Sequence, residues 1–446
     1  MTAHRTFETL ADWLDYQQRI HPRSIELGLA RTAEVWRRMG APRIAPVVIT
    51  VGGTNGKGST VAFLEAMLIA SGRRVGAYTS PHLLRYNERV RVDGNDVDDA
   101  ILIEAFEAIE RARGSDAPDA IALTYFEFGT LAALWIFAQS GVDAAVLEVG
   151  LGGRLDAVNI VDADAMIVTT VDLDHQDWLG NDRDSIGREK AGIFRRDRPA
   201  ILGEREPSAG LLAEADRIGA RLVRAGSDFH TEITASGWMW RSADAQLAGL
   251  PIPTLTAPVQ IDNAAAAIAA WHALRNRLGW PEEAIAQGAR RARVAARLQR
   301  VARPGAADII IDVAHNPQAA QVLARWLGDH PIVGRTFAVF GALSDKDIAG
   351  IVAPLAARFD AWFLGGLNAD TPRGLPAAAL AERVLAAAPE APVSLRAGIG
   401  PALDAAAAQA HPGDRVIAFG SFFVAAAAMT WTGAATVQPE AERPRV

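Results

Sequence analysis

PVVITVGGTNGKGSTVAFLEAMLIA, residues 46–70, is the stretch that decides the fold. The apolar run 47–51 predicts a buried strand, and apolar residues at helical spacing after position 60 predict a helix. A glycine-rich turn between a strand and a helix cradles phosphates, because backbone N–H groups, the helix N-terminus and a lysine all face the anion. Lys57 is followed by Gly58 before the first hydroxyl, so the spacing differs from G-x-x-x-x-G-K-[ST]. A purely structural tight turn is the alternative. We predict a nucleotide triphosphate site made by Gly53, Thr54, Asn55, Gly56, Lys57, Gly58, Ser59 and Thr60.

Composition narrows the class of protein. The chain has 446 residues, half of them hydrophobic, and a formal net charge of −7. That charge argues against a nucleic-acid or anionic membrane surface as partner. The sequence contains no cysteine, which excludes disulfides and thiolate chemistry. The N-terminal segment has no signal-peptide apolar core, and no apolar run is long enough to span a membrane. We therefore expect a cytoplasmic protein, monomeric, that acts on small molecules.

The order of predicted elements indicates an α/β fold. Strands alternate with helices, which is typical of βαβ units and a mostly parallel sheet with helices on both faces. We expect an N-terminal P-loop-type domain over residues 1–296, with a small β excursion within 226–258. A smaller Rossmann-like α/β domain follows over 297–446. The predicted strands are 47–51, 75–79, 87–92, 143–149, 165–171, 200–202, 308–313, 336–340, 361–364 and 415–418. The predicted helices include 101–113, 126–139, 185–194, 262–278, 282–293, 318–327, 347–356 and 377–388, with Asp262 as an N-cap.

Three polar side chains at predicted strand ends are candidate metal ligands. Ser80, Glu148 and His175 each follow an apolar strand of the same sheet. Open α/β sheets bind ligands beyond the carboxyl ends of their strands, and Mg²⁺ needs only a few protein oxygens beside phosphate. A buried ion pair is the alternative for Glu148, and an ordinary loop histidine for His175. On the residues alone, Lys190 is most simply a helix-surface lysine.

Seven motifs in order carry a resemblance to a known family. They are GTNGKGS, TSPHLLRYNERVRV, LTYFEFGTLAAL, LEVGLGGRLDAVNIV, LDHQDWLG, SIGREKAGIF and DVAHNPQAA. The chain resembles the folylpolyglutamate synthases, and more closely the bifunctional dihydrofolate synthase/folylpolyglutamate synthases, which are related to the Mur ligases. The likeness is dense over residues ~45 to ~320 and looser beyond, through GALSDKD and GSFFVA.

The resemblance implies a set of ATP and metal residues. Ser80 and Glu148 would hold one Mg²⁺, and Glu148, His175 and a carbamylated Lys190 would hold a second. His175 would then be a metal ligand and not a general base, while Lys57 stabilises charge on the phosphates. Asn263, Arg297, Asp312 and His315 would bind the base and ribose of ATP. Lys346, in GALSDKD, is a further candidate for phosphate or glutamate.

The resemblance also implies a folate site on the first domain. Its candidates are Ser80, Pro81, His82, Thr124, Phe126, Asp156, Ala157 and Asn159. Val158 stands where the family often has threonine, so a hydroxyl contact there is lost. Phe423 replaces a polar residue of the late motif.

The expected reaction is ATP-dependent addition of L-glutamate to dihydropteroate and to reduced folates through an acyl phosphate. The closest alternative is folylpolyglutamate synthase activity alone. Another Mur-type amide ligase and a P-loop ATPase acting through partners are more distant alternatives.

Overall fold

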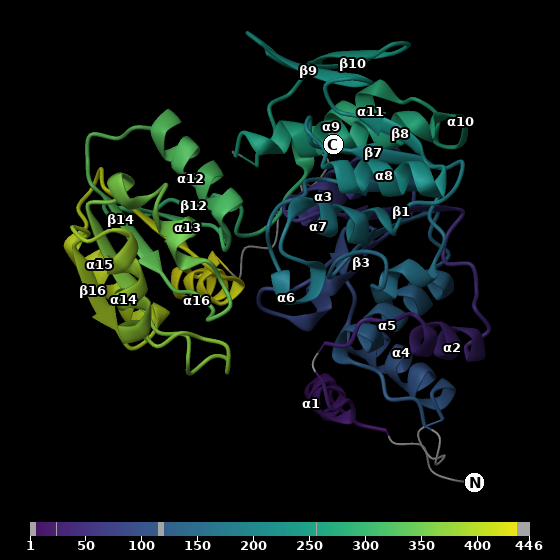
Figure 1. Cartoon of the computed structure of the whole chain (residues 1–446), viewed down its shortest axis with the longest axis horizontal. Helices are drawn as coiled ribbons and strands as arrows, with labels where there is room; N and C mark the ends of the chain where they lie inside the picture. The colour runs from purple at the N-terminus through teal and green to yellow at the C-terminus, as the bar shows by residue number, and fades with distance from the viewer. Residues whose placement is uncertain (1–5, 24, 115–119, 256, 435–446) are drawn as a thin grey trace, which may run out of the picture. The chain divides into compact units, whose positions relative to one another are not determined.

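The chain folds into two compact units. The computed structural model describes residues 6–23, 25–114, 120–255 and 257–434. The first unit comprises residues 1–254 and 260–293, and the second comprises 255–259 and 294–446. The short segment 255–259 thus lies with the second unit, although the sequence placed it before the domain boundary. Each unit has its own sheet (Figure 1).

The first unit is built on an eight-stranded sheet, which confirms the predicted α/β class. Its strand order is β4-β3-β2-β5-β1-β6-β7-β8. The pairs from β2 to β8 are parallel, and β3 and β4 are added antiparallel at one edge. The strands are β1 Val47–Gly52, β2 Val75–Tyr78, β3 Val90–Val92, β4 Asn95–Asp96, β5 Ala144–Glu148, β6 Ala165–Val168, β7 Pro199–Leu202 and β8 Arg221–Arg224.

Helices cover both faces of this sheet. Alternate strand residues such as Val48, Leu147 and Val168 join one hydrophobic cluster with α1, α2, α4, α5, α7 and α8. Figure 1 shows α1, α2, α4 and α5 gathered on one side of the unit. Strand residues that face the other way meet α3, which packs tightly on α11: a Cβ on Gly288 would lie 2.3 Å from the Met67 Cα. The helices are α1 Leu10–Ile20, α2 Ala30–Arg38, α3 Lys57–Ala70, α4 Asp99–Ala112, α5 Tyr125–Ser140, α6 Gln176–Leu179, α7 Arg183–Ala191, α8 Ala209–Ile218, α9 Val259–Ala273, α10 Arg275–Leu278 and α11 Glu282–Arg291, with the 3₁₀ turns η1 Tyr86–Arg89 and η2 Ala157–Ile160.

A three-stranded antiparallel sheet forms the predicted β excursion. It runs in the order β11-β10-β9, with β9 Phe229–Thr234, β10 Gly237–Ser242 and β11 Gln246–Leu250. Trp238 and Trp240 are fully buried from alternate positions of β10. The indole N–H of Trp238 donates to the Pro251 carbonyl at 3.0 Å. The tryptophan alternation therefore marks the inner face of this small sheet.

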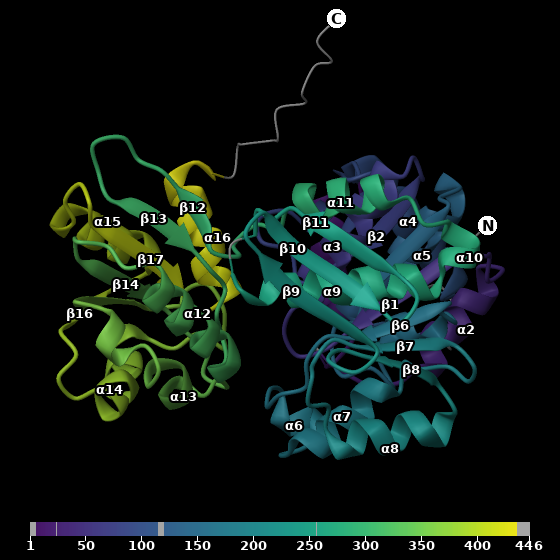
Figure 2. The same ribbon diagram turned by 90° about the horizontal axis from the view of Figure 1, so that it is seen from above.

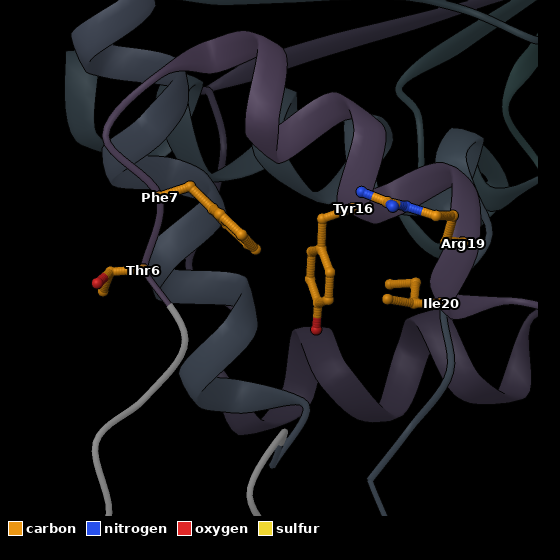
Figure 3. A pocket seen from close by; sticks show the side chains of 5 residues that line it. All are labelled: Thr6, Phe7, Tyr16, Arg19 and Ile20. Atoms are coloured by element: carbon orange, nitrogen blue, oxygen red, sulfur yellow. The ribbon is translucent and has the colours of Figure 1, made fainter.

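The second unit is a three-layer α/β domain. Its six-stranded sheet has the order β12-β13-β17-β14-β15-β16 and is parallel except for β12. Figure 2 shows α15 and α16 on one face of the sheet and α12, α13 and α14 on the other. The elements are β12 Gln299–Val301, β13 Asp308–Ile311, α12 Pro317–Asp329, β14 Thr336–Phe340, α13 Ile348–Val352, η3 Ala356–Arg358, β15 Ala361–Gly365, α14 Ala377–Ala387, β16 Val393–Arg396, α15 Ile399–Gln409, β17 Arg415–Phe419 and α16 Phe422–Thr432.

Two local predictions were wrong. The segment 87–92 begins as η1 and only its last three residues form β3, because the Glu88 carboxylate draws in the backbone N–H groups of Leu83, Leu84 and Arg85. Asp262 lies inside α9 instead of capping it, since the helix begins at Val259. No helix among the described residues is long and apolar enough to cross a membrane.

Candidate functional site

The loop between β1 and α3 is shaped by the end of β6. The Thr54 N–H donates to the Thr170 carbonyl at 2.7 Å, and the Asn55 N–H donates to the Thr170 hydroxyl at 3.1 Å. The Lys57 ammonium donates to the carbonyls of Gly53 and Thr54 at 2.9 and 3.1 Å. Lys57 thus lies folded over its own loop, with its charge held at the start of α3. That is the arrangement a phosphate-binding loop requires.

Two glycines of the loop permit close approaches. Gly53 has φ +141°, and a Cβ there would lie 1.8 Å from the Thr169 hydroxyl. Gly56 has φ +91°, and a Cβ there would lie 2.4 Å from the Asn263 amide oxygen. Asn263, a predicted nucleotide contact, is therefore brought against the loop. The Thr60 hydroxyl is buried and has no hydrogen-bond partner in the described part of the chain, as expected at a site shaped for a polar ligand.

The sheet brings Ser80 and Glu148 together beside this loop. Glu148 ends β5 with a buried side chain, and its Oε2 accepts a hydrogen bond from the Ser80 backbone N–H at 3.2 Å. The same oxygen faces α3, where a Cβ on Gly58 would lie 3.6 Å from it. Gly58 thus leaves the space between the helix start and the carboxylate open. A Cβ at 3.6 Å would be in ordinary van der Waals contact, so the protein alone does not require glycine at this position.

Lys190 is buried, contrary to the simplest expectation for a helix-surface lysine. It lies near the end of α7 with only 4% of its surface exposed. Burial, and after it the Lys57 charge, lower the pKa of Lys190 to about 7, while the charges of Asp174 and Glu204 oppose the shift. The glycine turn after β5 packs closely on this helix end, because a Cβ on Gly153 would lie 2.9 Å from the Lys190 carbonyl. A buried amine with a pKa near neutrality is partly uncharged, and hence nucleophilic, at physiological pH.

His175 lies on an exposed loop that is anchored to the phosphate loop. Thr54 and Asp172 exchange two hydrogen bonds, from the Thr54 hydroxyl to the Asp172 carbonyl and from the Asp172 N–H to that hydroxyl, at 3.1 and 3.0 Å. His175 itself has φ +52° and begins the short helix α6. Its backbone N–H donates to an Asp174 carboxylate oxygen at 2.9 Å. The loop start is therefore fixed, while the imidazole is on the surface.

Sequence reasoning missed the clamp that holds this loop. Glu204 accepts from the Val171 N–H at 3.2 Å, and the Arg183 Nε donates to the Val171 carbonyl at 2.9 Å. Arg183 also pairs with Glu204 at 3.1 Å. Both groups lie far from Val171 in the chain and belong to no recognised motif. Only the position of Glu204 just after an apolar strand gave a signal.

The donor set suits a hard divalent cation with few protein ligands. Within the described residues there is no group of three or more His, Asp or Glu side chains that could hold a metal ion. Glu148 and Ser80 are the oxygen-bearing residues that would supply ligands beside the phosphate loop. Mg²⁺ takes one or two protein oxygens and completes its shell with phosphate oxygens and water. The residues present therefore fit Mg²⁺ delivered with a nucleotide better than a closed structural metal site.

The predicted folate contacts on α5 form an aromatic corner. Thr124 caps α5 in a reciprocal box with Glu127: the Glu127 N–H donates to the Thr124 hydroxyl at 3.3 Å, and the Thr124 N–H donates to the Glu127 carboxylate at 2.8 Å. The Phe126 ring lies against the turn after β5, where a Cβ on Gly150 would approach it to 2.5 Å. Its ring centre is 6.2 Å from that of Tyr78. Phe126 is half-buried, so one part of its surface is available for stacking.

Asp156 and Asn159 have strong local partners. Asp156 is buried and accepts from the N–H groups of Leu151 and Val158 at 2.8 and 3.0 Å. Burial raises its pKa to about 6 in spite of those hydrogen bonds. The Asn159 amide donates to the carbonyls of Arg154 and Gly192 at 3.0 Å each, and its oxygen accepts from Arg195. Ala157 is buried between them. These residues hold the turn in shape, and their contact with a folate stays a prediction.

The remaining nucleotide candidates lie in the second unit. The Asp312 carboxylate accepts from the N–H groups of Leu298 and Ala314 at 2.8 Å each, and burial raises its pKa. The Arg297 guanidinium lies 5.9 Å from the centre of the Phe422 ring, and the His315 ring lies 6.0 Å from it. Ala296 and Leu298, on either side of Arg297, have φ +55° and +50°. Left-handed backbone at two non-glycine residues is costly and is found where a side chain must be presented in one direction.

The chain is similar in sequence and in structure to known proteins. A family model described as Mur ligase, glutamate ligase domain, matches residues 296–422. The chain is 45% identical over 420 residues to the dihydrofolate synthase/folylpolyglutamate synthase of Escherichia coli K12, covering 94% of each. E. coli FolC in complex with DHPP and ADP superposes with a TM-score of 0.88 at 44% identity, covering 96% of this chain and 99% of that one. A bifunctional folylpolyglutamate synthase/dihydrofolate synthase with Mn, AMPPNP and L-glutamate bound gives 0.86 at 43%, with the same coverage.

The fold and the phosphate loop place the chain among the ATP-dependent amide ligases of the Mur type. Within that class, the chain belongs to the dihydrofolate synthase/folylpolyglutamate synthase family. The family resemblance that the seven motifs indicated is thereby confirmed.

Proposed function

We propose that this chain joins L-glutamate to dihydropteroate, giving dihydrofolate, and to reduced folates, giving folylpolyglutamates. Family membership gives the class of reaction. The observation that carries the proposal in this chain is the convergence of Lys57, Ser80 and Glu148 at the carboxyl end of one parallel sheet. A carboxylic acid and a nucleotide can meet there, which is where open α/β sheets bind ligands.

The chemistry follows from charge neutralisation. A carboxylate oxygen of the acid attacks the γ-phosphorus of ATP, the bond to the β-phosphate oxygen breaks, and ADP leaves. The α-amine of glutamate then attacks the acyl phosphate carbon, phosphate leaves, and the amine loses a proton. Two anions must approach each other in the first step. Lys57 and the loop N–H groups stabilise that encounter by holding positive charge at fixed positions.

Ser80 and Glu148 would hold one divalent cation, and Glu148, His175 and Lys190 a second. When bound, the cations would supply Lewis-acid neutralisation of the phosphate oxygens and of the incoming carboxylate. His175 serves in this scheme as a ligand. Its anchored loop and exposed ring are compatible with contact to a metal–nucleotide complex.

Lys190 fits this scheme best as a carbamate. The neutral amine attacks CO₂, a C–N bond forms, and one proton is released, which converts a cation into an anionic oxygen ligand. The burial of Lys190 and its pKa of about 7 supply the neutral amine that this step needs. Asp174 and Glu204 would then lie near an anion, so the carbamate requires the positive charge of Lys57 or of a metal ion.

The other predicted residues complete the proposed site. Asn263, Arg297, Asp312 and His315 would bind the base and ribose, and Lys346 is a weaker candidate for phosphate or glutamate. Thr124, Phe126, Asp156, Ala157, Asn159 and the Ser80-Pro81-His82 loop would form the folate site. Phe126 supports this assignment because its half-buried ring offers a stacking surface. We propose residues 1–296 as the ATP- and folate-binding domain, residues 297–446 as the domain that closes over ATP and glutamate, and the monomer as the active form.

One assay tests the function. Purified protein is incubated with Mg-ATP, labelled glutamate and either dihydropteroate or a reduced folate, and amide product is measured. Product with both acids supports the bifunctional activity, and product with the folate alone would make the chain a folylpolyglutamate synthase only. ATP hydrolysis that is independent of any acid, with no amide product, would overturn the ligase assignment in favour of a P-loop ATPase.

A further inference from the structure

The loop that follows β2 is held by hydrogen bonds within the chain. The Glu88 carboxylate accepts hydrogen bonds from the N–H groups of Leu83, Leu84 and Arg85 at 2.7, 2.8 and 2.7 Å. The base of the loop is closed by the Thr79 N–H, which donates to the Arg89 carbonyl at 2.9 Å. These bonds restrain the loop at its base and at residues 83–85, and His82 lies between these two points. A preorganised loop loses little entropy when it binds a ligand.

Arg89 fixes how His82 carries its proton. The Arg89 Nε donates to the His82 Nδ1 at 2.8 Å. A guanidinium has no acceptor and stays protonated, so Nδ1 must be the accepting nitrogen. A neutral imidazole whose Nδ1 accepts carries its hydrogen on Nε2. The arginine thus selects the tautomer in which Nε2 donates.

The Arg89 side chain is itself held in place. It is only 8% exposed, and its guanidinium lies 5.3 Å from the centre of the Tyr86 ring and 5.5 Å from that of Tyr125. Across the described chain it forms no ion pair with a carboxylate. A buried guanidinium between two aromatic faces is stabilised by cation–π attraction but cannot turn freely. Its hydrogen bond to His82 is therefore directional.

The second nitrogen of His82 has no protein partner among the described residues. The imidazole is half-buried and lies 5.7 Å from the Tyr86 ring. Ser80, two residues earlier, donates to Glu148 beside the phosphate loop, and Tyr125 precedes the aromatic corner of Phe126. His82 follows Ser80 by two residues and lies against Tyr86, whose ring is 5.6 Å from that of Tyr125, so it is near both the Glu148 carboxylate and the aromatic corner. An acid with an aromatic body and a carboxylate end has the matching chemistry.

We propose that His82 binds the acid substrate through its Nε2–H, donating to an oxygen at the carboxylate end of the acid, and that Arg89 is the positioning residue that holds His82 in the donating tautomer. This role rests on the proposed function, because it assigns a contact within the folate site. A fixed neutral donor orients a carboxylate without neutralising it. His82 would thus orient the carboxylate towards phosphorus, while Lys57 and the bound cations would neutralise the charge.

Amide substitutions separate the two ring nitrogens. The amide nitrogen of His82→Gln reaches the place of Nε2, so this variant keeps the donor. His82→Asn ends at the place of Nδ1, where its oxygen can accept from Arg89, but it has no donor at the Nε2 position. We measure the dissociation constant of dihydropteroate by calorimetry in the presence of Mg-ADP. Loss of one hydrogen bond to a carboxylate is expected to weaken binding by His82→Asn about ten- to hundredfold, and binding by His82→Gln much less. The affinity for Mg-ADP should not change in either variant.

Nitrogen-15 spectra of the histidine rings test the tautomer directly. The wild-type His82 signal, assigned by its absence in His82→Gln, should show an unprotonated Nδ1 and a protonated Nε2. Arg89→Met should mix the two tautomers and weaken dihydropteroate binding. The control Arg85→Met, an exposed arginine of the same loop that pairs with Asp99, should do neither.

Two outcomes would overturn the inference. One is a wild-type His82 protonated on Nδ1, and the other is equal affinity for dihydropteroate in wild type, His82→Asn and His82→Gln. Neither measurement needs turnover. A protein that binds dihydropteroate as described but forms no amide would reject the proposed function separately.

Discussion

Lys57 and Lys190 belong to the same unit and their charges interact, yet their surroundings favour opposite protonation states of the same side chain. Lys57 is half-buried and its ammonium donates to two carbonyls of its own loop. Lys190 is almost completely buried, and burial together with the Lys57 charge lowers its pKa to about 7. Carbonyl acceptors favour a cation, whereas an apolar enclosure beside another cation favours a neutral amine. The Lys57 charge is thus the second cause, after burial, of the lowered pKa of Lys190.

Removing the Lys57 cation should have the largest effect on activity. Lys57→Met should lower kcat for amide formation by about a hundred- to a thousandfold, the usual effect of deleting one preorganised group that stabilises transition-state charge. Steady-state kinetics with saturating Mg-ATP measure it. Arg198→Ala, which removes the ion pair between the exposed Arg198, just before β7, and Asp164, is the control and should retain activity. Near-normal kcat in Lys57→Met would separate the loop lysine from phosphate chemistry.

Removing the Lys190 amine tests the proposed role of this second lysine. Lys190→Ala should lose most activity, since the proposed second metal site then lacks its anionic ligand, and short carboxylic acids such as acetate should restore part of it. Restoration is expected because a free carboxylate can enter the space left by the carbamate and offer the same oxygen ligands. Amide formation is measured with and without acetate. Wild-type activity in Lys190→Ala would remove the carbamate from the mechanism.

Restricting the space at Gly58 should have a smaller effect. Gly58→Ala places a methyl group 3.6 Å from Glu148 Oε2, which is an ordinary contact for the protein but takes space beside the carboxylate. We expect about a tenfold rise in the Mg²⁺ concentration needed for half-maximal rate, as for disturbed groups around a metal site. Gly400→Ala, in the first turn of α15 with nothing within 4 Å, is the matched control. Equal Mg²⁺ dependence in both variants would argue against a metal at Glu148.

The smallest expected effect is on the pH dependence of the free energy of unfolding, which reports the lowered pKa of Lys190. Unfolded lysine keeps its usual pKa near 10.5, while the folded Lys190 has a pKa of about 7. Between these values the unfolded chain binds one more proton, so stability rises with pH across this window and falls as pH drops towards 7. In CO₂-free buffer, the free energy of unfolding of wild type relative to Lys190→Met should rise by up to about 1.4 kcal/mol per pH unit. Urea titrations at pH 7, 8 and 9 measure it. If the difference in the free energy of unfolding between wild type and Lys190→Met does not change with pH, the folded Lys190 has its usual pKa and lies in a polar environment.

Several elements could be predicted because the apolar spacing and the glycine turns that define them lie within one short stretch of sequence. The strand, glycine turn and helix over 46–70 are encoded in one short stretch, and β14 begins and ends at the predicted residues. The prediction of a strand over 87–92 was wrong because three N–H groups donate to the Glu88 carboxylate. Hydrophobic alternation gives no information about such a contact. The Arg183–Glu204 clamp was not predicted from the sequence for a related reason. Val171 and Glu204 follow the neighbouring strands β6 and β7, Arg183 begins α7, and the three share no motif.

The sequence by itself determined the phosphate loop, the α/β class and the family, because glycine spacing and strand–helix alternation are properties of neighbouring residues. Only the tertiary structure decided which groups share one environment. It buried Lys190 and lowered its pKa, it turned Gly58 towards Glu148, and it placed the Arg89 Nε on the His82 Nδ1. Burial, electrostatic coupling and hydrogen-bond direction depend on distances between segments that are far apart in the chain. Chemical roles within the site therefore follow from the packing of the sheet and its helices.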